Sequence, residues 1–129
     1  TNGTVASKLN GHNSYVSAVI FTPDNKTLIS GDASSDIRFW NLENGTQLDV
    51  LTGSSNKINA MTVSSDGKLL ATAGEDSTVR LWNLSTKKAV VTLSGHTKET
   101  NAVAFTPDDK KILSGSDDFT IKIWNLEDN

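Results

Sequence analysis

Apolar and polar residues alternate with a period of two along most of this chain. The clearest alternating pairs are Val19 and Phe21, Met61 and Val63, and Val103 and Phe105. Such alternation is typical of β-strands, because successive side chains point to opposite faces. The opposite face carries Ala18, Ala60 and Ala102. Apolar side chains on both faces predict interior strands that are covered on both sides.

The pattern predicts strands near residues 15–21, 27–31 and 36–41, and at the corresponding positions of two later segments. Further strands are predicted at residues 4–9, 46–51 and 89–93, and no segment has a helical pattern. Tight hairpins with positive φ are expected where short polar residues interrupt the alternation. These hairpin sequences are Asp24-Asn25, Asp66-Gly67 and Asn44-Gly45.

An internal repeat organises the whole sequence. Trp40, Trp82 and Trp124 follow one another at intervals of 42 residues, and each is followed by Asn-Leu. A repeat of this length with four short strands is the size of a β-propeller blade. We therefore predict an all-β fold of three four-stranded antiparallel blades, which span residues 1–43, 44–85 and 86–129.

Several motifs of the repeat resemble those of the WD-repeat family. They are Gly11-His12 and Gly95-His96, Ser30-Gly31 and Ser114-Gly115, and the strand ends Arg38-Phe39-Trp40, Arg80-Leu81-Trp82 and Lys122-Ile123-Trp124. The resemblance covers essentially the whole chain. The sequence departs from the family in one respect, because Trp-Asn replaces the usual Trp-Asp in all three repeats.

The resemblance implies that a hydrogen-bonded tetrad of His, Ser or Thr, Asp and Trp holds each blade. The third repeat matches it fully, with His96, Ser114, Asp118 and Trp124. The first two repeats match in part, with His12, Ser30 and Trp40, and with Thr72, Asp76 and Trp82. Ser34 occupies the Asp position of the first repeat and Ser54 the His position of the second. We expect these two blades to be less rigid than the third.

Composition and charge narrow the classes of function. With 36% hydrophobic and 21% charged residues and a net charge of -3, the chain has the composition of a globular protein without general attraction for nucleic acid. No apolar run is long enough to span a bilayer, so we expect no membrane partner. The absence of cysteine excludes thiol chemistry and fits a reducing compartment such as the cytoplasm, although the sequence does not fix the localisation.

Candidate chemistry is sparse. His96, Ser114 and Asp118 have the residue types of a serine-hydrolase triad, but no nucleophile-elbow glycine pattern surrounds Ser114. With Trp124 as a fourth partner, a structural role is the favoured interpretation and a hydrolase is the alternative. The two histidines lie in different repeats and most carboxylates lie in turns, so we predict neither a metal nor a cofactor.

The resemblance further implies a disc that presents loops to proteins or peptides. Aromatic and charged residues are expected in the loops at one end of the strands, where they favour partner binding. These residues are Tyr15, Lys57, Lys98, Glu99 and Phe119. Packing between neighbouring blades is an equally good interpretation of the same residues.

Three blades do not close a ring, since propellers typically have about 4 to 8 blades. We therefore predict self-assembly into a homodimer with six blades or a homotrimer with nine. In this hypothesis the strand at residues 4–9 completes the last blade of a neighbouring chain. The uniform repeats and the absence of an initiator Met also fit an engineered or excised fragment without a ligand of its own.

Overall fold

The computed structural model describes residues 2–52 and 56–126, which form strands and no helix. The first sheet contains β1 (Val16–Phe21), β2 (Thr27–Asp32), β3 (Ile37–Asn41) and β4 (Gln47–Leu51). The second contains β5 (Ile58–Val63), β6 (Leu69–Gly74), β7 (Thr78–Asn83) and β8 (Lys88–Ser94). The third contains β9 (Thr100–Phe105), β10 (Lys111–Ser116) and β11 (Ile121–Asn125).

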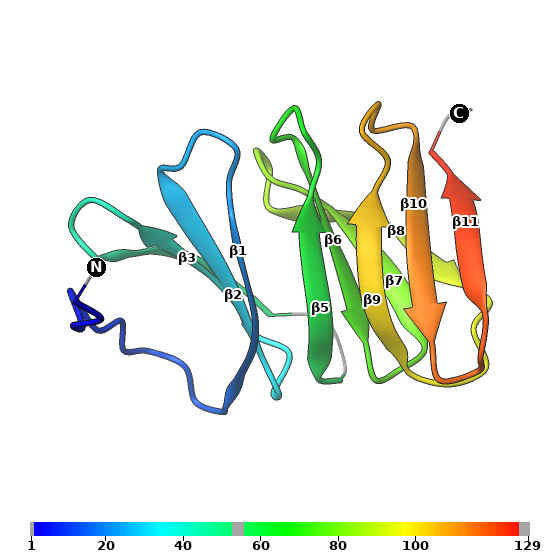
Figure 1. Cartoon of the computed structure of the whole chain (residues 1–129), viewed down its shortest axis with the longest axis horizontal. Helices are drawn as coiled ribbons and strands as arrows, with labels where there is room; N and C mark the ends of the chain where they lie inside the picture. Colours follow the sequence, from blue (N-terminus) through cyan, green and yellow to red (C-terminus); the bar gives the residue numbers. More distant parts are fainter. Residues whose placement is uncertain (1, 53–55, 127–129) are drawn as a thin grey trace.

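Each sheet is an antiparallel meander in which consecutive strands pair. Figure 1 shows the three sheets side by side, with the sheet that contains β1 at one end of the row and the sheet that contains β11 at the other. The first strand of each sheet lies against the first strand of the next, so β5 contacts both β1 and β9. The predicted all-β class is confirmed, as are the predicted strands that follow residue 15.

The turn chemistry explains why the hairpins form at these positions. Asn25, Gly67 and Asp109 hold the same place in the first hairpin of each sheet and have φ of 58°, 72° and 58°. Gly45 has φ of 71° in the hairpin between β3 and β4. Gly, Asn and Asp tolerate this left-handed conformation better than other residues, so the predicted positive-φ turns are confirmed.

The hydrophobic core lies between the sheets rather than within one of them. One buried cluster joins the first and second sheets and includes Ile29, Phe39, Ile58 and Leu70. A second cluster joins the second and third sheets and includes Ala71, Val79, Leu81 and Ile112. Each sheet is therefore stabilised mainly by the neighbour that covers it.

One expectation about the strands is wrong, because residues 4–9 form no strand. The third sheet has three strands within the described part of the chain, and its outer strand is expected from a neighbouring chain. The order of the strands explains both observations. The outer strand of each sheet follows its tryptophan strand, as β4 follows β3 and β8 follows β7. Residues 4–9 precede the first sheet and have no such tryptophan strand to pair with.

Within residues 2–52 and 56–126, no helix is long and apolar enough to cross a membrane.

Candidate functional site

Four side chains of the third sheet meet in one hydrogen-bonded cluster. Nδ1 of His96 lies 2.7 Å from a carboxylate oxygen of Asp118, and Nε2 lies 2.8 Å from Oγ of Ser114. Nε1 of Trp124 lies 2.8 Å from the same Oγ. β10 supplies the serine, β11 the tryptophan and the turn between them the aspartate, whereas the histidine lies between β8 and β9. The cluster therefore links the third sheet to the segment that enters it.

One assignment of protons satisfies every member of this cluster. The indole N–H of Trp124 donates to Oγ of Ser114, whose hydroxyl donates to Nε2 of His96. The imidazole Nδ1–H then donates to Asp118. The hydrogen bond from the Thr120 hydroxyl and then that from His96 outweigh desolvation, and they hold the pKa of Asp118 well below its usual range. Asp118 is the ionised end of this hydrogen-bond chain.

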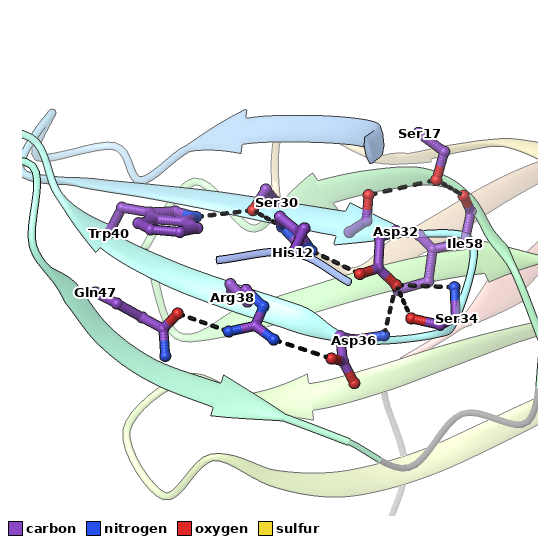
Figure 2. Close-up of polar contacts among 11 residues, drawn as sticks. His12, Ser17, Ser30, Asp32, Ser34, Asp36, Arg38, Trp40, Gln47 and Ile58 are labelled. Carbon is purple, nitrogen blue, oxygen red and sulfur yellow. Dashed lines mark hydrogen bonds and ion pairs between the residues drawn. The ribbon is translucent and has the colours of Figure 1, made fainter. Parts of the chain in front are cut away.

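The first sheet contains a cluster of the same kind, shown in Figure 2. Nε1 of Trp40 lies 2.8 Å from Oγ of Ser30, which lies 2.5 Å from Nε2 of His12. Nδ1 of His12 lies 2.7 Å from a carboxylate oxygen of Asp32 at the end of β2. The expectation that this blade lacks the carboxylate is therefore wrong, because Asp32 holds the histidine where Ser34 cannot.

The first and third repeats exchange an aspartate and a serine. Asp32 aligns with Ser116, and Ser34 aligns with Asp118. In the first sheet the Ser34 hydroxyl donates to Asp32 at 2.8 Å. Burial raises the pKa of Asp32, but hydrogen bonds from His12 and Ser34 outweigh it and leave that pKa below its usual value. The sequence signal for this residue is an aspartate two positions earlier in the same turn.

The second sheet holds its carboxylate differently. Oγ1 of Thr72 accepts a hydrogen bond from Nε1 of Trp82 at 3.1 Å. Asp76 forms an ion pair with Arg80 at 2.6 Å and accepts a hydrogen bond from the Thr78 hydroxyl. Ser54, which aligns with the two histidines, lies outside the described residues. Arginine thus neutralises the carboxylate of this blade.

The geometry of the third-sheet cluster has the order Ser-His-Asp of a hydrolase triad, but its serine is enclosed. Ser114 is 1% exposed, and Trp124 already donates to its Oγ. A nucleophile must be reached by its substrate and by an oxyanion hole. Among residues 2–52 and 56–126, no group of three His, Cys, Asp or Glu side chains is placed to hold a metal ion.

The five expected partner-binding residues lie at one end of the sheets. Main-chain N–H groups of the β2–β3, β6–β7 and β10–β11 turns donate to the main-chain oxygens of Tyr15, Lys57 and Glu99. Nζ of Lys57 lies 5.5 Å from the centroid of the Tyr15 ring, and Nζ of Lys98 lies 5.8 Å from that of Phe119. Tyr15 is 64% exposed and Phe119 is 95% exposed. Four of the five residues therefore form two cation–π pairs on an open surface, and Glu99 belongs to neither pair.

The comparisons with known proteins agree with this geometry. The family model described as "WD domain, G-beta repeat" matches residues 3–41, 45–83 and 87–125. Two similar solved structures carry the titles "Structure of U3-55K" and "Crystal structure of RRP9 WD40 repeats". Each is 28% identical to this chain over 92% of its length, with a TM-score of 0.87. This chain spans 38% and 37% of those two chains, and no curated protein matches it.

Proposed function

Because the chain belongs to the WD40-repeat family, we propose that it is a protein-interaction module whose propeller is completed by self-association. WD40 domains typically bind other proteins, and this chain contributes three sheets of such a propeller. The observation that carries the proposal is the unfinished third sheet. Among the residues that the structure describes, β11 has one edge without a strand, whereas β3 and β7 are each paired on both sides.

A segment whose sequence matches the missing outer strand occurs near the start of the same chain. Residues 5–9 align with residues 47–51 and 89–93, which are the outer strands of the first two sheets. In those sheets Leu51 pairs with Ile37, and Leu93 pairs with Val79. The same register places Leu9 of one chain opposite Ile121 of another. Pairing of this kind removes an exposed sheet edge, which otherwise promotes uncontrolled aggregation.

Head-to-tail pairing closes into a ring only with whole chains. Two chains provide six blades and three chains provide nine, and the typical range is about 4 to 8 blades. Size-exclusion chromatography with light scattering over a range of protein concentrations measures the number directly. We expect a discrete dimer or trimer, and a monomer at every concentration would refute self-association.

A cysteine pair tests the strand register itself. The native sequence contains no cysteine, so Leu9→Cys and Ile121→Cys introduce the only two thiols of the chain. We expect oxidation to link chains covalently, because directly opposed strand residues lie within disulfide reach. Lys88→Cys in place of Ile121→Cys is the matched control, since Lys88 lies on β8, which belongs to the second sheet rather than to the sheet of β11. Equal cross-linking in both variants would contradict the register.

We assign the contact with other proteins to the loop end of the sheets. Tyr15 and Phe119 are exposed aromatic side chains of the kind that anchors interfaces. The equivalent turn residues in the other repeats are Ser35 and Ser77, so Phe119→Ser introduces a residue that the fold already accepts at this place. We expect this variant to retain the assembled mass. A fall in mass would place Phe119 between neighbouring chains instead.

A hydrolase is the second candidate, because the cluster of His96, Ser114 and Asp118 has triad-like distances. The enclosure of Ser114 argues against this activity. A panel of activated esters tests it, with Ser114→Ala as the control. Turnover that disappears in the variant would favour the hydrolase over the structural role.

A further inference from the structure

Some exposed apolar side chains lie on the outer strands, and others lie on the two end faces of the row of sheets. We call the face that a sheet turns toward the following sheet its trailing face, and the face turned toward the preceding sheet its leading face. The leading face of the first sheet exposes Val16, Val19 and Phe21. The trailing face of the third sheet exposes Ile121 and Ile123. Within the described residues, no other sheet covers either face, and Leu9 and His12 line a hollow beside Val16 and Val19 on the leading face.

The uncovered trailing face repeats positions that are buried elsewhere. Ile121 is 74% exposed, whereas its equivalents Ile37 and Val79 are 1% and 0% exposed. Ile123 is 63% exposed, and both of its equivalents are 2% exposed. Burying apolar side chains of this kind stabilises a contact. We therefore expect another sheet to pack against this face, as the following sheet packs against the trailing faces of the first two sheets.

The uncovered leading face shows the same contrast. Val16 is 49% exposed, whereas its equivalents Ile58 and Thr100 are 1% and 0% exposed. Val19 is 58% exposed, and its equivalent Met61 is 9% exposed. The two ends of one chain thus carry the two halves of a contact that the chain makes twice internally.

One pair of positions indicates that the two uncovered faces fit each other. In the contact between the first and second sheets, these positions are Gly31 and Ile58. A Cβ at Gly31 would lie 3.0 Å from the side chain of Ile58, so glycine makes room for this large residue. Gly115 is equivalent to Gly31, and a Cβ there would meet only the Cβ of Ala102, at 3.6 Å. An apolar hollow of about 220 Å³ lies over Gly115, lined also by Ala104 and Ile121. The residue equivalent to Ile58 is Val16, at the other end of the chain.

A hydrogen bond between neighbouring sheets recurs at the 42-residue spacing of the repeat. The Ser17 hydroxyl donates to the main-chain oxygen of Ile58 (Figure 2), and Nδ2 of Asn59 donates to that of Thr100 at 3.1 Å. Asn101 is the next residue in this series and lies on the uncovered side of the third sheet. Its Nδ2 donates to Asp117 of its own sheet at 2.5 Å. The acceptor that continues the series is the main-chain oxygen of Val16.

We propose that the trailing face of the third sheet binds the leading face of a second copy of this chain, with Val16 of that copy in the hollow over Gly115. Nδ2 of Asn101 donates to the main-chain oxygen of the same Val16. This inference rests on the proposed self-association and names the surfaces and the direction of the contact. The contact is head-to-tail, since each chain contributes a different face.

Two single variants test the two faces separately. Gly115→Ile places a side chain in the hollow, and its Cβ makes only an ordinary contact with Ala102, so we expect a folded protein by circular dichroism that no longer assembles. Val16→Asp places a carboxylate in the apolar contact, and we expect the same loss of assembled mass. Val90→Asp is the matched control, because Val90 is 57% exposed on the outer strand β8. This control should assemble like the unmodified chain.

Mixing the two variants tests the direction of the contact. A chain with Gly115→Ile retains an intact leading face, and a chain with Val16→Asp retains an intact trailing face. We expect each to be monomeric alone and the mixture to form a one-to-one dimer that cannot close into the ring. Assembly of either variant alone would contradict the head-to-tail contact.

Asn101→Ala tests the polar contact within an assembly that still forms. We expect its dissociation constant to rise about 3- to 10-fold, which corresponds to the loss of one hydrogen bond. If the unmodified chain assembles and Gly115→Ile assembles equally well, the proposed surfaces are wrong and self-association stands. If the unmodified chain is monomeric, both proposals fail and other blades or another partner cover these faces.

Discussion

The carboxylate of Asp32 lies 2.7 Å from Nδ1 of His12, in the repeat whose turn carries a serine where the third repeat carries Asp118. The two aspartates reach equivalent imidazoles from positions two residues apart. Each of the two exchanged serines also forms a hydrogen bond within its turn. Ser34 donates to Asp32, and Oγ of Ser116 accepts from the amide of Asp118. One network is therefore built from the same residue types in two orders.

This exchange predicts a rescue experiment. Asp32→Ser alone leaves the Nδ1–H of His12 without its acceptor, and we expect it to lower the free energy of unfolding by about 1–3 kcal/mol. Adding Ser34→Asp gives the first repeat the order found at Ser116 and Asp118, and we expect it to recover most of the loss. Urea denaturation midpoints at one fixed protein concentration measure both effects. A double variant as unstable as the single one would show that the two orders are not interchangeable.

His96→Ala tests the network of the third sheet. The substitution removes the hydrogen-bond partner of both Ser114 and Asp118, and Ser114 is only 1% exposed. We therefore expect the free energy of unfolding to fall by about 1–3 kcal/mol. Thr92→Ala is the control, because this side chain is exposed on β8 and should change stability by less than about 0.5 kcal/mol. Equal denaturation midpoints for both variants would contradict a stabilising role for the histidine.

The sequence correctly predicted the strands that pair within the chain. It failed at residues 4–9, whose expected partner strand belongs to a different repeat. Alternation and the 42-residue spacing locate β1 to β11, because each of these strands carries its own apolar face. Residues 4–9 have the sequence of an outer strand, but a strand also needs a neighbouring strand with which to pair. The strand proposed to pair with them is β11, which belongs to the third sheet.

The site was predictable only in part for a different reason, since its contacts lie within single repeats. Alignment of repeats assigns each role to one fixed position, and it therefore found Asp118 and overlooked Asp32. A turn of this size brings either position within reach of the same imidazole, which is a property of the backbone rather than of the pattern. The pairing of Asp76 with Arg80 was likewise hidden, because it depends on which side chain lies beside an unmatched carboxylate.

Acid should destabilise this protein through its hydrogen-bonded aspartates. The folded-state pKa values of Asp32 and Asp118 lie below the ordinary 3.8, so their ionised forms stabilise the fold above that pH. This contribution is lost as the pH falls through the lowered pKa values. We expect stability to be level above about pH 5 and to fall below about pH 4.

Asp32→Asn separates one of these carboxylates from the rest. The variant lacks the proton-linked contribution of Asp32, so the gap in stability between it and the unmodified protein should narrow as the pH is lowered from about 6 to about 3. Urea midpoints at several pH values measure this gap. A constant gap would mean that Asp32 acts through shape and hydrogen bonding rather than through its charge.

Two threonines allow the same chemical change to be tested with opposite expected signs. Thr100 is fully buried between the second and third sheets, and its hydroxyl has no hydrogen-bond partner among the described residues. Its equivalents Ile58 and Val16 are both apolar, so the site accepts a hydrocarbon side chain. We expect Thr100→Val to raise the free energy of unfolding by about 1 kcal/mol, because it removes a buried polar group without a partner.

Thr72→Val is the matched variant in the second sheet. Oγ1 of Thr72 accepts the indole N–H of Trp82 at 3.1 Å, and the substitution leaves that buried donor without an acceptor. We expect a loss of about 1–2 kcal/mol. Thermal or urea denaturation of the two variants side by side gives the comparison, since both replace a hydroxyl by a methyl group. If Thr100→Val were also destabilising, its hydroxyl would have a partner such as a buried water, and the contact between the second and third sheets would be more polar than its side chains indicate.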